Sequence, residues 1–204
     1  MTPSERRFAP TTVRQDRNGV RYGLEQVSAF IGIRTTWGRT STNAQVWDVS
    51  QSVVAQRIPV RLCNHAAFSP NNRWLVVGNG TEFRVWDVAT WQSRFAMPSG
   101  AAGFYGQSAF SPDSQVLAVA ISRTTVRLVE ATSGRELAML EAPERLVINW
   151  IAFNLDGTQL AVALATGPIQ IWDLRLIRQQ LASMNLDWDL PPYPLAQATQ
   201  PAQP

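Results

Sequence analysis

A unit of about 42 residues repeats along this chain of 204 residues. Each copy opens on Ala-Phe and a polar turn, continues through a short apolar stretch, and closes on a bulky apolar residue followed by an acid. The opening phenylalanines of the three clearest copies, Phe68, Phe110 and Phe153, are 42 and 43 positions apart. Their closing pairs are Trp86-Asp87, Val129-Glu130 and Trp172-Asp173. A period of this length indicates a repeat architecture.

The second copy shows what each unit contains. Apolar runs and alternating stretches of four to eight residues, separated by Ser-Pro-Asn-Asn and Gly-Asn-Gly turns, predict short strands. The predicted strands of this copy are 61–68, 74–77, 83–86 and 93–97. Those of the third copy include 116–120, 125–129 and 136–140. The sequence therefore predicts an all-β fold built from units of four strands.

A degenerate copy precedes these three. Phe30 is followed 17 residues later by Trp47-Asp48, against 18 residues from Phe68 to Trp86. This first copy has Ile31-Gly32 where the others have a Ser-Pro or Asn-Leu turn. We count it as a fourth unit.

Residues 28–174 resemble the WD40 repeat family. The resemblance rests on Phe68-Ser69-Pro70, Phe110-Ser111-Pro112-Asp113, Asp156-Gly157 and the two Trp-Asp pairs at 86–87 and 172–173. It implies a partial β-propeller of about four blades, the first of them degenerate, with a short C-terminal helix and an extended Pro-rich tail. It further implies that the repeat positions are structural; these are Trp47, Asp48, Phe68, Trp86, Asp87, Phe110, Phe153, Trp172 and Asp173.

The predicted domain organisation has three parts. Residues 1–18 are polar and predict a disordered segment, and residues 19–174 form the repeat region. Residues 175–204 are expected to be helical and then Pro-rich, because Leu174, Ile177, Leu181 and Met184 form a helical stripe with Asp173 as its N-cap. The tail resembles the segment after the last blade of large bacterial multidomain WD40 proteins, many of which carry an upstream Ser/Thr kinase domain.

The number of copies leaves the quaternary arrangement open, because an open arc of blades exposes strand edges and apolar faces. The four units could close a small ring, or two chains could form a homodimer that completes a larger propeller. In a third alternative, the chain is a truncated remnant of a multidomain signalling protein without independent activity.

Composition excludes several classes of protein. The sequence contains no lysine, so it offers neither a phosphate-binding lysine of a kinase or P-loop NTPase nor a Schiff-base amine. No apolar run is long enough for a membrane span, and no signal peptide is apparent. The arginines are dispersed rather than gathered in a stripe, which argues against nucleic-acid binding. One cysteine, Cys63, excludes an internal disulfide and fits the cytoplasm.

His65 is the only histidine, and the sequence lacks the additional residues that two possible chemical roles would require. Cys63 and His65 could be half of a metal site, but no further Cys or His exists to complete it. A Ser-His-Asp triad could use only His65, and the sequence holds no Gly-x-Ser-x-Gly elbow. We therefore expect no catalytic residues, no metal and no cofactor, and a chain that is not an enzyme.

Candidate contacts with a partner follow from the repeat. His65, Gln107 and Trp150 each precede the opening phenylalanine by three residues, so they occupy equivalent positions on successive first strands. Tyr105 and Arg123 lie in loops that share one face in WD40 proteins, and both residue types are common at interfaces. The sequence thus predicts a non-catalytic protein–protein interaction scaffold whose partner is a protein of unknown identity.

Overall fold

The computed structural model describes residues 44–48, 51–100, 106–143, 146–167 and 169–193. Within these residues, thirteen strands form four antiparallel sheets, followed by one helix, and no sheet closes on itself. The expected all-β class and the short C-terminal helix are confirmed. Residues 1–18, Phe30, Tyr105 and the end of the tail, 194–204, lie outside the described residues.

Each sheet consists of strands that are consecutive in sequence. The first pairs β1 (Ala44–Asp48) with β2 (Val53–Ile58). The second contains β3 (His65–Phe68), β4 (Trp74–Gly78), β5 (Glu82–Asp87) and β6 (Gln92–Pro98). The third contains β7 (Ser108–Phe110), β8 (Val116–Ala120), β9 (Thr125–Glu130) and β10 (Glu136–Glu141). The last contains β11 (Ile148–Phe153), β12 (Gln159–Leu164) and β13 (Ile169–Asp173), which leads into α1 (Leu174–Ser183).

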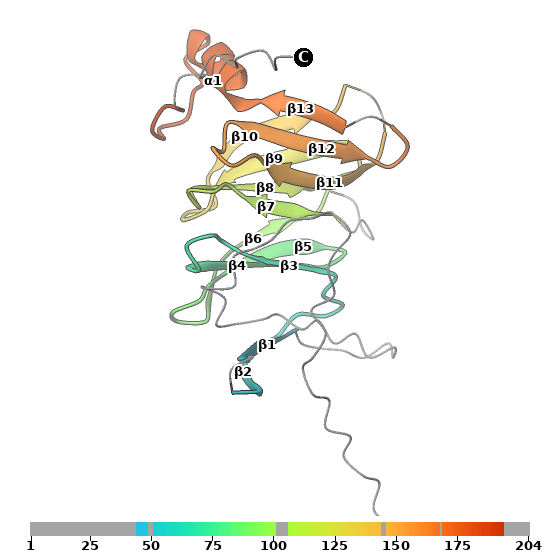
Figure 1. Ribbon diagram of the computed structural model, residues 1–204, viewed down its shortest axis with the longest axis vertical. Coiled ribbons are helices and arrows are strands. Elements are labelled where there is room, and N and C mark those ends of the chain that lie inside the picture. The colour runs from blue at the N-terminus through green and yellow to red at the C-terminus, as the bar shows by residue number, and fades with distance from the viewer. Residues whose placement is uncertain (1–43, 49–50, 101–105, 144–145, 168, 194–204) are drawn as a thin grey trace, which may run out of the picture.

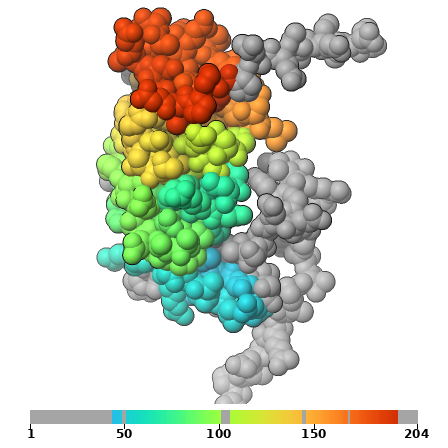
Figure 2. Space-filling view, turned by 90° about the vertical axis from the view of Figure 1, so that its left-hand side faces the viewer, coloured from blue at the N-terminus to red at the C-terminus, as the bar shows by residue number. Residues whose placement is uncertain are grey.

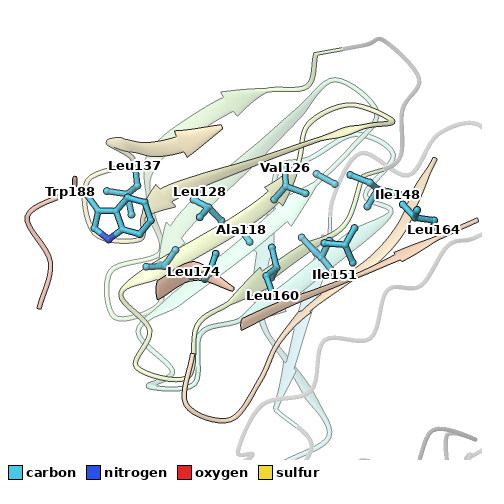
Figure 3. Packing of buried hydrophobic residues seen from close by; sticks show 13 residues of the cluster. Ala118, Val126, Leu128, Leu137, Ile148, Ile151, Leu160, Leu164, Leu174 and Trp188 are labelled. Atoms are coloured by element: carbon cyan, nitrogen blue, oxygen red, sulfur yellow. The ribbon is translucent and has the colours of Figure 1, made fainter. Parts of the chain in front are cut away.

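The four sheets stack face to face in sequence order, as the colour gradient in Figures 1 and 2 shows. Three apolar clusters fill the three junctions between successive sheets. We call the side of a sheet that faces the following sheet its forward face, and the opposite side its back face. Figure 3 shows the cluster at the last junction, where Ala118 and Leu128 of the third sheet meet Ile151 and Leu160 of the last.

The middle strands show how the stack determines burial. Every residue of β4 (Trp-Leu-Val-Val-Gly) and of β8 (Val-Leu-Ala-Val-Ala) is buried, because neighbouring sheets cover both faces. In β12 buried and half-buried residues alternate, because a described sheet covers only its back face. Coverage on both faces thus explains why β4 and β8 are almost continuously apolar, and it does not apply to β12.

The polar turn after each opening phenylalanine has the same hydrogen bond in all three copies. The side-chain oxygen of the residue after the phenylalanine accepts the backbone N–H five residues further on, which closes the turn. The pairs are Ser69 with Trp74 at 2.9 Å, Ser111 with Val116 at 2.9 Å, and Asn154 with Gln159 at 3.0 Å.

The acid that ends each copy also has a local structural role. Asp87 Oδ1 accepts the N–H groups of the next turn, from Ala89 at 2.9 Å and Thr90 at 3.2 Å. Asp173 does the same for α1, where it is the N-cap and accepts from the backbone of Arg175 and Leu176. In the third copy, Glu130 accepts a hydrogen bond from the hydroxyl of Ser133 in the turn after β9. The acid therefore begins a turn in two copies and a helix in the last.

The helix and the tail cover the outer strand β10 of the third sheet, which has no fourth strand opposite it in the last sheet. Leu174 and Trp188 are buried in the last junction together with Leu137 of β10 (Figure 3). The helix ends where expected, since Asn185 adopts a positive φ of 58° beyond the last turn.

Two details of the prediction were wrong. The first strand of the second copy begins at His65 and not at residue 61, because Leu62 has a φ of 55° and the chain turns there. Met184, expected on the apolar stripe, is the exposed C-cap residue after α1, and within α1 the charged residue Arg178 is buried.

Candidate functional site

The first strands of the three larger sheets, β3, β7 and β11, lie side by side and form one groove. The groove has a volume of about 630 Å³. Its lining comes from the three strands and the turn after β3: His65, Ala66, Ala67, Phe68, Ser69, Pro70, Asn72, Ser108, Ala109, Phe110, Trp150, Ile151, Ala152 and Phe153. Repetition places equivalent residues next to one another, so the groove follows directly from the stack.

A histidine–serine pair joins the first two strands of the groove. His65 Nε2 lies 2.6 Å from Ser108 Oγ and 3.2 Å from the backbone N of Ser108. A backbone N–H can only donate, so Nε2 is the acceptor and the imidazole is neutral, with its proton on Nδ1. The ring also meets Phe83 edge-on, with centroids 6.4 Å apart.

Burial lowers the pKa of His65 below its usual value, which agrees with a neutral ring. The side chain of Gln107 opposes this shift by hydrogen bonding to the imidazole. The structure thus brings together His65 and Gln107, two of the three residues at equivalent repeat positions.

Trp150, the third of these residues, is on β11 and lines the same groove as His65. Its side chain is 58 % exposed, which makes it the largest exposed aromatic surface of the groove lining. Arg123 lies in the loop between β8 and β9, where its carbonyl accepts the N–H of Ile148 at 2.7 Å. The structure does not include Arg123 in the groove lining.

The chemistry of the groove is apolar and uncharged. Among the described residues, no Asp, Glu or Arg lines it, and the polar groups that do are neutral hydroxyl, amide and imidazole groups. Ser108 is buried, so its hydroxyl is not presented to solvent as a nucleophile would be. Among the described residues, no three His, Cys, Asp or Glu side chains are grouped so that they could hold a metal ion. In the same part of the chain, no helix is long and apolar enough to cross a bilayer.

Sequence reasoning missed Ser108 and Arg178. Ser108 lies two residues before Phe110, where the other copies have Ala66 and Ile151, so the signal was a polar residue at an otherwise apolar repeat position. Arg178 falls on the apolar stripe of α1, four residues after Leu174, and a charge on such a stripe implies a buried partner.

Arg178 holds the tail against the helix. Its guanidinium pairs with both carboxylate oxygens of Asp187, at 2.9 and 3.0 Å. It also donates to the carbonyls of Trp188, Leu190 and Pro191 at 3.1, 2.9 and 2.7 Å. Hydrogen bonding from Arg178 holds the pKa of Asp187 below its usual range.

Comparison with known proteins gives no family assignment. No protein-family model matches the sequence. A search of curated proteins finds no match either.

Proposed function

We propose that the repeat region, 19–174, is a segment of a WD40-type β-propeller and that each sheet is a blade. The repeat period, the Trp-Asp pairs and the serine-closed turns support this proposal. So does the constant register of the three larger sheets. In each, the leucine that pairs with the opening phenylalanine also pairs with the residue before the closing acid: Leu75 with Trp86, Leu117 with Val129, and Leu160 with Trp172.

In this proposal the chain is a non-catalytic scaffold that binds another protein. The observation that carries it is the groove along β3, β7 and β11, which presents the exposed ring of Trp150 in apolar surroundings. Large aromatic side chains in apolar pockets are the usual anchors of protein–protein interfaces. The buried Cys63 thiol is compatible with action in the cytoplasm.

The lining indicates the chemistry of the bound segment. Because the described lining of the groove has no charged residue, it offers nothing to neutralise phosphates, so nucleic acid is a poor ligand. An uncharged segment with aliphatic or aromatic side chains fits better, because it buries apolar area against the Ala, Phe and Trp side chains of the groove. The neutral His65 and Ser108 fit the same kind of ligand, since neither brings a charge into the groove.

The test is selection of neutral peptides from a displayed library on the purified chain, followed by calorimetric titration of the selected peptide. We expect Trp150→Ala to weaken binding by about 10-fold or more, as loss of an aromatic anchor does. A matched control is Leu155→Ala, because Leu155 is 98 % exposed and outside the groove.

The outcomes separate the alternatives. A selected peptide that binds the Trp150→Ala protein as tightly as the wild type would show that the groove is not the binding site. Salt-dependent binding of single-stranded DNA, in place of any neutral peptide, would support a nucleic-acid function instead.

A further inference from the structure

The forward face of the last sheet is apolar, and no described strand or helix packs on it. The register aligns its residues in two rows across β11, β12 and β13. One row is Trp150, Ala163 and Ile169, and the other is Ala152, Ala161 and Ile171. Ile169 is 66 % exposed and Ile171 is 56 % exposed. We call these six residues the terminal face.

The repeat shows what normally covers these positions. The residues equivalent to Ile169 and Ile171 are Phe83 and Val85 in the second sheet, and Val126 and Leu128 in the third. All four are 0 % exposed. Each pair packs into the junction with the following sheet. The surface that fits the terminal face is therefore the back face of another repeat unit, as at the junctions within the chain.

The back faces have a constant composition. In the second sheet it includes Phe68, Leu75 and Trp86, which pack into the first junction. In the last sheet it includes Phe153, Leu160 and Trp172, which pack into the last junction. The contact is mainly apolar in each case. The back faces also carry Arg84, which pairs with Val77 across β4 and β5, and Arg127, which pairs with Val119 across β8 and β9.

The chain has a back-face residue of the same kind at the opposite end of the stack. Trp47 on β1 is the counterpart of Trp86 and Trp172, and it lies on the side of β1 opposite to Ala44 and Val46. Ala44 and Val46 pack into the first junction, so Trp47 faces away from the stack. The register places Val54 beside Trp47 on this side of the sheet, and Gln45 and Arg57 further along it. Trp47 and Val54 can therefore offer the terminal face an apolar contact of the kind found at the junctions.

We propose that the terminal face binds a second copy of this chain, head to tail, through the back face of the copy's β1–β2 sheet. The contact repeats the packing already present at three junctions within one chain. Such an interface is heterologous: it closes a ring if the rotation between copies allows it, and otherwise it propagates. The docking depends on the sheet packing and does not require the groove to bind a protein.

The first test is the mass of the purified chain by light scattering, from about 1 to about 100 µM. We expect the mass to rise with concentration from one copy to two or more. Ile171→Glu should weaken self-association by at least ~30-fold, because it places a charge in an apolar contact. Leu155→Glu, an exposed apolar residue away from this face, should associate as the wild type does. Far-UV circular dichroism verifies that each variant is folded.

The second test distinguishes head-to-tail from face-to-face association. Trp47→Ala and Ile171→Glu should each fail to associate alone, yet a mixture of the two should form a heterodimer, because each variant keeps the surface that the other lacks. If Trp47→Ala is not folded, Val54→Glu replaces it, since Val54 pairs with Trp47 across β1 and β2.

Three results would overturn the proposal. The first is a wild-type chain that stays monomeric over the whole concentration range. The second is association that Ile171→Glu does not weaken. The third is a folded β1 or β2 variant that associates as tightly as the wild type, which would mean that the terminal faces of two copies bind each other.

Discussion

Replacing Arg178 with alanine is the most informative change to the C-terminal region. The guanidinium makes five hydrogen bonds to the segment 187–191, two of them to the carboxylate of Asp187. Its side chain is 9 % exposed, and that of Asp187 is 30 % exposed. Arg178 also lies over the rings of Trp188 and Tyr193, 5.1 and 5.5 Å from their centroids. No other described residue joins the helix to the tail through so many polar contacts.

Two estimates bound the loss of stability expected for Arg178→Ala. Removing one partner of a buried ion pair costs about 3–5 kcal/mol, because it leaves the other charge and its hydrogen-bonding groups without compensation. The partly exposed Asp187 can recover hydration, which favours the lower end of that range. The tail can also detach, at the cost of exposing Trp188, a loss of roughly 1.5–3 kcal/mol for a large apolar side chain. We therefore expect Arg178→Ala to lower the free energy of unfolding by about 3 kcal/mol.

The assay is urea unfolding followed by far-UV circular dichroism, with hydrogen exchange of residues 186–193. Arg175→Ala is the matched control, because it makes the same substitution in the same helix at an ion pair with Asp173 whose two side chains are each 26 % exposed. It should lower the free energy of unfolding much less than Arg178→Ala does, since a pair that water reaches contributes little. Arg178→Lys should restore only part of the loss, because an ammonium cannot make the paired contact with both carboxylate oxygens. Equal stability of the Arg178→Ala and Arg175→Ala proteins, or an Arg178→Ala tail still protected from exchange, would refute the anchoring role.

Three further predictions concern pH and backbone. The guanidinium of Arg178 holds the pKa of Asp187 low in the folded state, so the stabilising contribution of Asp187 is present above about pH 3.9 and is lost as the pH falls further. Between about pH 5 and about pH 2.5, the free energy of unfolding should therefore decline less steeply for Asp187→Asn than for the wild type. Burial lowers the pKa of His65, so the folded state binds fewer protons than the unfolded chain below about pH 6.5. The free energy of unfolding should therefore fall from about pH 7.5 to about pH 5, and His65→Gln should remove the share of this pH dependence that is due to the imidazole. Gly134 has a φ of 76°, and an added Cβ would lie 2.6 Å from an aromatic ring, so Gly134→Ala should lower the melting temperature more than Gly157→Ala, where φ is 73° and the nearest atom is 3.3 Å away.

The repeat explains why most strands could be predicted. Strands such as 116–120 and 125–129 match β8 and β9 closely, because three copies of one pattern reinforce the same apolar runs and turns. The start of β3 could not be predicted in this way. Arg61 and Leu62 continue an alternating pattern, but Leu62 takes up a left-handed backbone conformation that no local preference of leucine favours.

The candidate site was predictable in position but not in its contacts. Equivalent offsets predicted that His65, Gln107 and Trp150 belong to successive first strands. His65 and Trp150 do lie on β3 and β11, whereas Gln107 lies just before β7, where its side chain contacts His65. The hydrogen bond from Ser108 to His65 depends on how closely β3 and β7 approach, which no sequence period specifies. The anchoring of the tail by Arg178 likewise depends on a chain reversal after α1 that the helical period does not predict. For the same reason Met184 was expected to be buried on the apolar stripe, whereas it is exposed.

The way the last unit ends determines which kind of association the chain favours. A last sheet of three strands could add a strand at the edge of β13 or could stack another sheet on its face. The helix and the tail cover β10 with Leu174 and Trp188, so the outer side of the last junction is already filled. The terminal face has no such cover, and Ile169 and Ile171 remain exposed there. The face holds three large exposed side chains, Trp150, Ile169 and Ile171, and burying each is favourable by about 1.5–3 kcal/mol. A strand added to the five-residue edge of β13 would form only a few backbone hydrogen bonds, each worth about 0.5–1.5 kcal/mol net. Stacking on the face therefore offers more free energy than adding a strand at the edge, and substitutions of the isoleucines should weaken association more than a proline at the edge of β13.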